Sequence, residues 1–258
     1  MKTVILCGGR GMRLQEETEF RPKPLVPIGR RPILWHIMKI YAHYGFREFV
    51  LCLGYRGELI KEYFLNYKAM NSDFTMNLGR LGSIEYCETY GEQDFIITLA
   101  ETGLETMTGG RIKRVERYID DDTFMVTYGD GVADIDIQAL VKYHHEHGRL
   151  ATVTAVHPSS RYGILTLDNN SGVLEFAEKS RMEEWASAGF FVFNRRVFDY
   201  LERDDCILER EPLEHLAQEG QLMAYTHNGF FHAMDTYRDY KYLNELWDRG
   251  DTPWKKWE

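Results

Sequence analysis

The chain has 258 residues, of which 44% are apolar, and its 40 acidic residues outnumber 31 basic ones to give a net charge of −9. This length and apolar content suit one large α/β domain, with or without a small appended subdomain. A protein that binds a nucleic-acid backbone over a broad surface usually carries a net positive charge. Because the net charge here is negative, we expect no nucleic-acid partner.

The N-terminal segment predicts a buried strand that opens into a phosphate-binding loop. Residues 3–7 are apolar and mostly β-branched, and three glycines follow within residues 8–14. Such a loop lets backbone N–H groups converge on the oxygens of a polyphosphate. Arg13 and Lys23 would add positive charge beside it. The segment matches neither the Walker loop nor the complete dinucleotide-binding fingerprint.

Strand and helix patterns alternate through most of the remaining chain. Apolar runs predict strands, and apolar residues at helical spacing predict helices. The expected helices cover about 33–44, 58–67, 108–118, 137–147, 195–202, 209–219 and 237–248. The expected strands cover 48–54, 124–128, 151–156, 189–193 and 222–226. This alternation implies parallel crossover units and therefore a three-layer α/β fold with a mixed, mostly parallel sheet.

Two segments depart from this alternation. Residues 73–105 are more polar and suggest short strands that extend one edge of the sheet. Residues 164–176 carry a turn signal, Asn-Asn-Ser-Gly, between two apolar runs, which predicts a hairpin and hence a small β-rich insertion. Because no linker, repeat or low-complexity segment interrupts the chain, we expect a single domain spanning residues 1–258.

Two aspartates are candidate metal ligands. Asp130 follows the predicted strand 124–128, where open α/β sheets bind their ligands, and Asp235 directly precedes the last helix. Mg²⁺ prefers oxygen ligands and usually takes one or two carboxylates together with substrate phosphates. The alternative for Asp130 is a turn carboxylate, and for Asp235 it is a helix N-cap.

Other residues favour structural roles. The four cysteines have no metal-type spacing, which predicts reduced thiols and a cytoplasmic location. The chain begins with a strand, and no apolar run is long enough for a membrane span, so we expect no membrane association. His144, His145 and His147 are interpreted as part of a helix surface rather than a metal site, and Trp254 and Trp257 as packing anchors or subunit contacts.

The glycine loop and the Pro-Lys-Pro motif at 22–24 resemble the signature of the sugar-phosphate nucleotidyltransferases, Gly-Gly-x-Gly-Thr-Arg-Leu followed by Pro-Lys-Pro. Residues 32–38, 107–114 and 128–134 extend the resemblance to the glucose-1-phosphate cytidylyltransferases, and it covers essentially the whole chain. It implies a Rossmann-like nucleotidyltransferase fold and a homo-oligomer. It also implies transfer of a cytidylyl group from CTP to α-D-glucose 1-phosphate, which gives CDP-glucose and pyrophosphate.

The resemblance assigns roles to individual positions. Arg13 and Lys23 would be catalytic, Asp130 and Asp235 would hold Mg²⁺, and Glu178, Lys179, Gly163 and Ser187 would bind the acceptor. The residues implied for nucleotide binding are Leu6, Cys7, Gly8, Gly9, Arg10, Gly11, Met12, Gly110, Arg111 and Gly129. Phosphoryl-type transfer depends on positioning and charge stabilisation, so such a set is chemically sufficient without a protein nucleophile.

Several positions depart from the family pattern, mostly in the acceptor half. Met12 replaces Thr, Ser180 replaces Pro, Ser187 replaces Asn, and His232 lies in a segment that replaces Phe-Trp-Gln. A lost amide or hydroxyl removes hydrogen bonds that select substrate hydroxyls. Two alternatives therefore stay open beside the cytidylyltransferase of glucose 1-phosphate. One is a cytidylyltransferase for another phosphorylated or phosphonylated acceptor, and the other is a non-catalytic nucleotide-binding paralogue.

Overall fold

A mixed sheet forms the centre of the molecule. The computed structural model describes residues 1–79, 84–87, 91–92, 94–158, 164–167, 171–177 and 184–257. Within them the strand order is β13-β10-β14-β8-β1-β4-β7, and β15 also pairs with β10. The strands are β1 (Thr3–Leu6), β4 (Glu48–Leu53), β7 (Ile96–Glu101), β8 (Thr123–Tyr128), β10 (Ala151–Val156), β13 (Ala186–Ser187), β14 (Phe191–Asn194) and β15 (Leu222–His227).

Parallel pairing dominates the half of the sheet that carries the N-terminus. Strand β1 pairs in parallel with β4 and β8, and β4 pairs in parallel with β7. Strand β14 runs antiparallel to both β8 and β10, whereas β15 is parallel to β10. The predicted mixed, mostly parallel sheet is thus confirmed.

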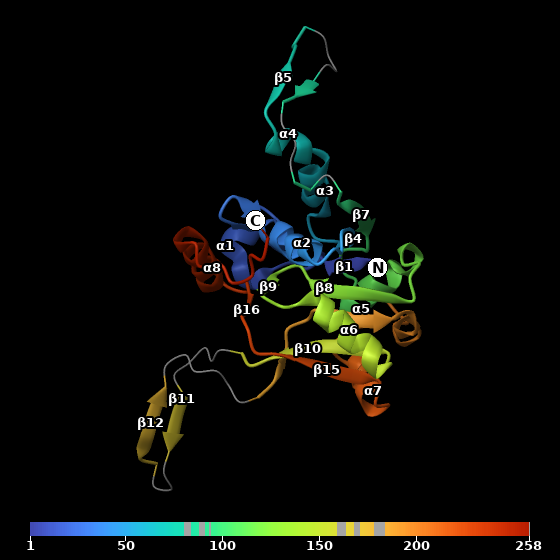
Figure 1. Ribbon diagram of the computed structural model, residues 1–258, viewed down its shortest axis with the longest axis vertical. Helices are drawn as coiled ribbons and strands as arrows, with labels where there is room; N and C mark the ends of the chain where they lie inside the picture. Colours follow the sequence, from blue (N-terminus) through green and yellow to red (C-terminus); the bar gives the residue numbers. More distant parts are fainter. Residues whose placement is uncertain are drawn as a thin grey trace.

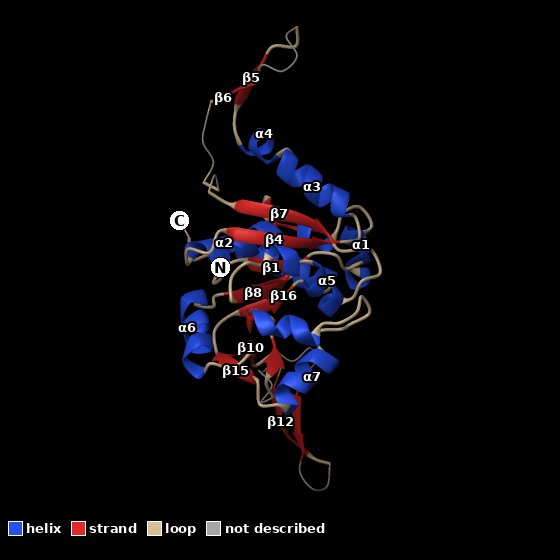
Figure 2. Ribbon diagram, turned by 90° about the vertical axis from the view of Figure 1, so that its right-hand side faces the viewer, coloured by secondary structure: helices blue, strands red, loops and turns tan. Residues whose placement is uncertain are grey.

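Helices cover both faces of this sheet (Figure 2). The α-helices are α1 (Gln15–Thr18), α2 (Ile33–His43), α3 (Gly57–Leu65), α4 (Tyr67–Asn71), α5 (Thr108–Arg114), α6 (Ile137–His147), α7 (Glu211–Gln218) and α8 (Tyr237–Arg249). The helix predicted over 108–118 ends at Arg114 and continues as a 3-10 turn, and the segment 195–200 is 3-10 rather than α-helical.

Successive side chains of β1 and the residue after it point alternately into two buried clusters, one on each face of the sheet. Val4 and Leu6 belong to the buried cluster that contains residues of α5 and α7, whereas Ile5 and Cys7 belong to the cluster that contains residues of α2 and α6. Successive side chains of a strand point to opposite faces of the sheet, so both faces of β1 are buried.

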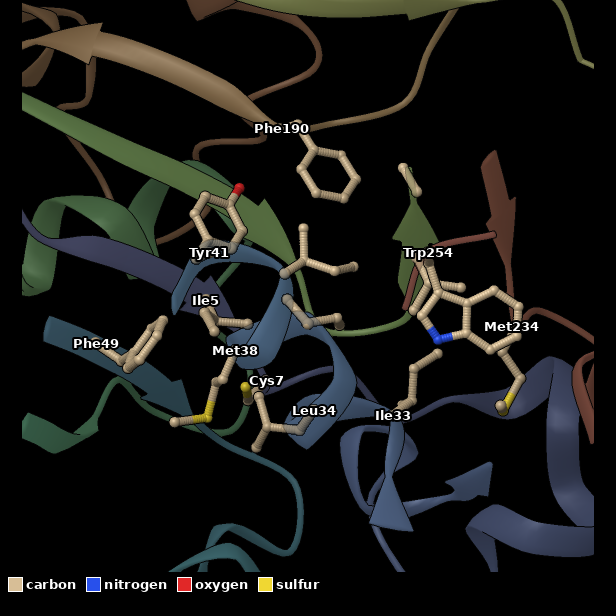
Figure 3. Close-up of a cluster of buried hydrophobic side chains, with 14 of the residues drawn as sticks. Ile5, Cys7, Ile33, Leu34, Met38, Tyr41, Phe49, Phe190, Met234 and Trp254 are labelled. Atoms are coloured by element: carbon tan, nitrogen blue, oxygen red, sulfur yellow. The ribbon is translucent and has the colours of Figure 1, made fainter. Parts of the chain in front are cut away.

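The larger cluster packs around α2 (Figure 3). Tyr41 on this helix stacks on Phe190, with ring centroids 5.9 Å apart and an interplanar angle of 14°. Trp254 near the C-terminus is fully buried in the same cluster, and its indole N–H donates to His36 Nδ1 at 3.4 Å. Trp254 therefore anchors the end of the chain to α2, as predicted for a packing residue.

Two hairpins project from the body of the molecule (Figure 1). One consists of β5 (Phe74–Met76) and β6 (Ile84–Tyr86), the other of β11 (Ile164–Leu167) and β12 (Val173–Ala177). Each forms its own two-stranded sheet. The second hairpin is predicted correctly, but the expectation that the whole of 73–105 extends the main sheet is wrong, because only β7 joins it.

A short pair of strands that the sequence pattern does not reveal ties the C-terminal part to the centre. Strand β9 (Gly131–Ala133) runs antiparallel to β16 (Phe231–Ala233), with His232 opposite Val132. Each strand is too short to show a period. Among the described residues, no helix is both long enough and apolar enough to cross a bilayer.

Candidate active site

A cavity of about 400 Å³ lies where the chain leaves β1 and β8. Its lining includes twelve of the positions implied by the sequence. They are Leu6, Cys7, Gly8, Gly9, Arg10, Gly11, Met12, Arg13, Lys23, Arg111, Gly129 and Asp130. Because β1 and β8 are adjacent parallel strands, the loops after them meet at one edge of the sheet, which is where open α/β sheets bind their ligands.

The glycine loop is shaped by hydrogen bonds within its own segment. The N–H of Leu14 and the hydroxyl of Thr18 each donate to the Gly11 carbonyl at 3.0 Å. Gly11 has a φ of +63°, a left-handed conformation that glycine adopts without strain. The loop therefore turns tightly into α1 and leaves Arg13 mostly exposed at the cavity.

Four charged groups converge beside this loop. The Lys23 ammonium nitrogen lies 2.7 Å from Oδ2 of Asp130 and 2.7 Å from Oδ1 of Asp235. Arg13 donates to the other Asp235 oxygen at 3.2 Å. Burial alone would lower the pKa of Lys23, but the charges of Asp130 and Asp235 and their hydrogen bonds outweigh it and raise that pKa. Lys23 is thus held as a cation between two carboxylates.

The β9–β16 pair explains why Asp130 and Asp235 meet although they are far apart in the chain. Asp130 directly precedes β9 and its carbonyl accepts from the Met234 N–H at 2.8 Å. Asp235 then lies in the turn between β16 and α8. The N-cap of α8 is Thr236, which forms a capping box with Asp239, so Asp235 is not the capping residue. Its carboxylate is left to face Lys23 and Arg13.

Arg111 is buried behind the glycine loop. Its guanidinium donates to the carbonyls of Leu53, Gly103 and Leu104 and to the Thr102 hydroxyl, at 2.7–3.3 Å. It also donates to the Gly8 carbonyl at 3.1 Å.

A side chain at Gly8 would collide with this guanidinium. A Cβ added there would come within 2.2 Å of Nη1 of Arg111. Gly8 is therefore needed for the close approach of Arg111, and Arg111, which also lines the cavity, fixes the start of the loop.

The cavity lining also contains residues that were not predicted as site residues from the sequence. They are Pro24, Thr106, Met107, Thr108 and Tyr128. Thr108 and Tyr128 both donate their hydroxyls to the Glu209 carboxylate, Thr108 at 2.6 Å. The position of Tyr128 at the carboxyl end of a buried strand, two residues before Asp130, is a signal that could have identified it.

Several predicted positions do not line this cavity. An added Cβ at Gly110 would meet backbone atoms of Arg203 and Asp204 within 3.0 Å, so Gly110 packs against that segment. Ser187 is exposed on β13, where its hydroxyl accepts from the Gly189 N–H at 3.3 Å. Gly163, Glu178 and Lys179, together with Ser180, lie outside the described residues.

The histidines of α6 bond to a threonine. His144 Nδ1 and His147 Nε2 lie 2.8 and 2.7 Å from the Thr152 hydroxyl, whereas His145 is exposed. Within the described part of the chain, no group of three His, Cys, Asp or Glu side chains is arranged to hold a metal ion. The interpretation as a helix surface fits the exposed His145, whereas His144 is buried against β10.

The comparison with known proteins identifies the family. Residues 2–228 match the family described as "Nucleotidyl transferase". The chain belongs to this family. A glucose-1-phosphate cytidylyltransferase of Salmonella typhi is 47% identical, and a probable glucose-1-phosphate cytidylyltransferase of Bacillus subtilis is 45% identical, both over the full length of the two chains. The resemblance found in the motifs is therefore confirmed, and the chain is an enzyme rather than a non-catalytic paralogue.

Solved structures confirm the fold. UDP-glucose pyrophosphorylase complexed with UDP-glucose superimposes with a TM-score of 0.69 at 15% identity, covering 96% of this chain and 98% of that one. HddC from Yersinia pseudotuberculosis complexed with GMP-PN superimposes with a TM-score of 0.66 at 21% identity, covering 95% of this chain and 99% of that one. The Rossmann-like nucleotidyltransferase fold predicted for this chain is thus correct.

The enzyme's carboxylate pair fits the donor set of a divalent cation. Asp130 and Asp235 each place an oxygen 2.7 Å from one nitrogen, so these two oxygens are no more than about 5.4 Å apart. Both side chains are partly exposed, at 27% and 19%, and Asp130 lines the cavity whereas Asp235 does not. Two hard oxygen ligands supplemented by phosphate oxygens and water are what Mg²⁺ usually takes.

Proposed function

We propose that this enzyme transfers the cytidylyl group of CTP to the phosphate of α-D-glucose 1-phosphate. A phosphate oxygen of glucose 1-phosphate attacks the α-phosphorus of CTP. The bond between the α-phosphorus and the oxygen that bridges it to the β-phosphorus breaks. The products are CDP-glucose and pyrophosphate. The proposal is supported by the names of relatives that are 45% and 47% identical over their whole length.

The observation that carries the proposal is the convergence of Lys23, Arg13, Asp130 and Asp235 at the mouth of the glycine loop. The backbone N–H groups of residues 8–11 would bind the triphosphate. Lys23 and Arg13 would stabilise negative charge as the α-phosphorus changes partners. Arg111, which lines the cavity and donates to backbone carbonyls around it, would shape the nucleotide site.

We assign Mg²⁺ to Asp130 and Asp235. A bound Mg²⁺ supplies positive charge to phosphate oxygens during transfer. Cys7, although it lines the cavity, supplies no nucleophile, because burial raises the pKa of its thiol well above the ordinary value.

The proposed acceptor-binding residues are taken from the resemblance to the glucose-1-phosphate cytidylyltransferases. We propose that Glu178, Lys179 and Gly163 bind glucose 1-phosphate, with Ser187 at the edge of that region, and that Gly110 supports the cytosine side through the packing of α5. Met12 is 72% exposed at the cavity and has no useful hydrogen-bond donor, so it weakens contact with a phosphate relative to Thr.

We propose a single domain and a homo-oligomer. The projecting hairpin β5–β6 and the helix before it expose the large apolar side chains of Met70, Phe74, Met76, Leu78 and Ile84. Apolar residues exposed together mark interaction surfaces. The cytoplasmic location predicted from the cysteines stays a prediction, although all four are free in the structure.

The test is pyrophosphate release from CTP, UTP, dTTP and GTP with a panel of sugar 1-phosphates and other phosphorylated acceptors, with and without a chelator. We expect turnover only with Mg²⁺, CTP and glucose 1-phosphate. Efficient turnover of CTP with a different acceptor would move the assignment to that acceptor and leave the cytidylyltransferase chemistry intact. Equal rates with UTP would remove the nucleotide assignment.

A further inference from the structure

A second cavity, of about 510 Å³, lies away from the glycine loop. It is lined by Arg30, Arg31, Trp35, Lys39, Gly91, Glu92, Trp247, Lys255 and Trp257. None of the described residues that line one cavity lines the other. The cavity brings together α2, α8 and the C-terminal segment, and Figures 1 and 2 both show the C-terminus beside α2.

Positive charge dominates this cavity although the chain carries a net charge of −9. Its lining holds four cationic side chains and a single carboxylate, that of Glu92. Glu92 already pairs with Lys39 at 3.2 Å and accepts from the Tyr67 hydroxyl at 2.9 Å. Among the described residues, no carboxylate lies within ion-pair distance of Arg30 or Lys255, and both are exposed.

Aromatic rings form much of the remaining wall. Trp35 and Trp257 meet edge to face with ring centroids 5.6 Å apart and an interplanar angle of 84°. The Arg31 guanidinium lies 5.4 Å from the Trp35 ring centroid. Trp247 completes the aromatic part of the lining. Partly buried tryptophans beside cations present both a stacking surface and charge.

The wall that carries Arg30 is held rigidly. Arg30 lies in the turn between β2 (Pro27–Ile28) and β3 (Arg31–Pro32), next to Gly29. The Gly29 N–H donates to Asn244 Oδ1 at 2.9 Å, and an added Cβ at Gly29 would come within 2.2 Å of Nε1 of Trp247. The turn is thus fastened to α8, and the cavity is formed before any ligand binds.

We propose that this cavity is a binding site for a small anion that carries a planar aromatic ring, of about the size of a mononucleotide. The volume falls within the range of about 300–1,000 Å³ that is usual for small-molecule sites. Arg30 and Lys255 would bind the anionic group, and the ring would stack on the tryptophans. An anion without a ring would leave the aromatic wall unused, which is why the two features together define the ligand class.

Tryptophan fluorescence gives a local readout. The second cavity holds three of the five tryptophans, whereas the lining of the catalytic cavity contains none among the described residues. The probes are ATP, which joins a ring to negative charge, adenosine, which supplies the ring alone, and tripolyphosphate, which supplies the charge alone. ATP is not the proposed substrate, and we expect it to give saturable quenching at lower concentration than either of the other two.

The decisive comparison uses Arg30→Ala with Lys255→Ala in the full-length enzyme. We expect the double variant to raise the ATP dissociation constant at least about tenfold, because two charge-assisted contacts are lost. Lys142→Ala with Arg196→Ala, two exposed cations elsewhere, is the matched control and should bind ATP like the wild type. CTP turnover should be the same in all three proteins, since none of these residues lines the catalytic cavity.

Three results would overturn the proposal. The first is the absence of saturable quenching by ATP, or equal affinity in the double variant and the wild type. The second is tripolyphosphate binding as tight as that of ATP, which would make the site a general anion surface. The third is quenching by ATP only at protein concentrations at which the oligomer has dissociated, which would mean that a second copy of the chain fills the cavity. If the wild-type enzyme does not turn over CTP, this result would contradict the proposed function and leave the second binding site untouched.

Discussion

The ammonium group of Lys23 lies 2.7 Å from Oδ1 of Asp235, so this lysine occupies space between the two proposed metal ligands. Because its second contact, to Asp130, has the same length, one ammonium group contacts both carboxylates. Lys23 and the proposed divalent cation would therefore compete for the same carboxylates in the nucleotide-free enzyme.

This competition leads to the first prediction. Lys23→Met should tighten Mn²⁺ binding to the nucleotide-free enzyme several-fold, because the two carboxylates lose their positive partner. The same change should lower kcat by about 10² or more, the scale of removing one charge-stabilising donor. Calorimetric titration with Mn²⁺ and steady-state pyrophosphate release measure the two effects. Lys61→Met, which removes a surface partner of Glu101, is the control and should change neither.

Metal dependence gives the second prediction. Asp130→Asn and Asp235→Asn should each abolish Mg²⁺-dependent turnover while the unfolding transition stays close to that of the wild type. An amide has the shape of a carboxylate but lacks the charge that holds Mg²⁺. Asp204→Asn, at an exposed ion pair with Arg114, should keep full activity. Unchanged metal dependence in both active-site variants would remove the assignment.

The third prediction separates two neighbouring glycines. Gly8→Ala should lower the free energy of unfolding by about 1–3 kcal/mol and weaken CTP binding, because the new methyl group displaces Arg111. Gly9→Ala should change the free energy of unfolding by less than about 0.5 kcal/mol, since nothing lies within 4 Å of its added Cβ. Urea unfolding of both variants tests the difference. Equal losses would show that the loop needs glycine for its backbone and not for Arg111.

Arg111 itself provides the fourth prediction. Arg111→Lys should cost about 2–4 kcal/mol of stability, because a lysine cannot serve the several carbonyls that the guanidinium joins. Arg114→Lys, on the same helix but at an exposed ion pair, should cost less than about 1 kcal/mol. The comparison is made by urea unfolding at one pH. A small loss at Arg111 would contradict the structural role given to it here.

Acid sensitivity gives the fifth prediction. Burial lowers the pKa of His36 from 6.5 to about 4. The unfolded chain therefore binds a proton between these values and the folded one does not, so stability is complete above about pH 6.5 and falls as the pH drops toward 4. The loss from this residue approaches about 3 kcal/mol at the lower end. His144, whose pKa burial also lowers to about 4, adds a loss of the same sign.

Urea unfolding across this pH range checks the effect. His36→Gln keeps a donor for the Ile28 carbonyl and should be less stable than the wild type near neutral pH, yet lose less stability on acidification. The exposed His145 serves as the control, and His145→Gln should follow the wild-type curve. Parallel curves for the wild type and His36→Gln would show that another group controls the acid sensitivity.

Most of the fold could be predicted because its elements are long enough to show their periods. The apolar run of β1 and the helical spacing of α2 both coincide with the observed elements. Strands β9 and β16 could not be predicted, since three residues show no period. The sequence predicts that β5 and β6 extend the main sheet, whereas they form a sheet of their own, because weak alternation identifies a strand without identifying its partner.

Some features of the site could likewise be predicted from the sequence, and others could not. Lys23 and Asp130 could be found from motifs because each stands beside a glycine-rich or proline-rich turn of recognisable composition. The sequence predicts nucleotide binding for Arg111 but not the hydrogen bonds that its guanidinium donates to carbonyls of several loops. Such contacts depend on how three loops meet in space, which no local pattern records.

The pairing of β9 with β16 also sets the order in which this enzyme can become active during synthesis. Strands β1, β4, β7 and β8 are complete by residue 128, but Asp235 joins Asp130 only when residues 231–233 have paired. A ribosome-bound chain that ends before this point has its glycine loop and lacks Asp235, one of the two proposed metal ligands. On the proposed assignment, transfer therefore waits until the C-terminal segment has paired with β9.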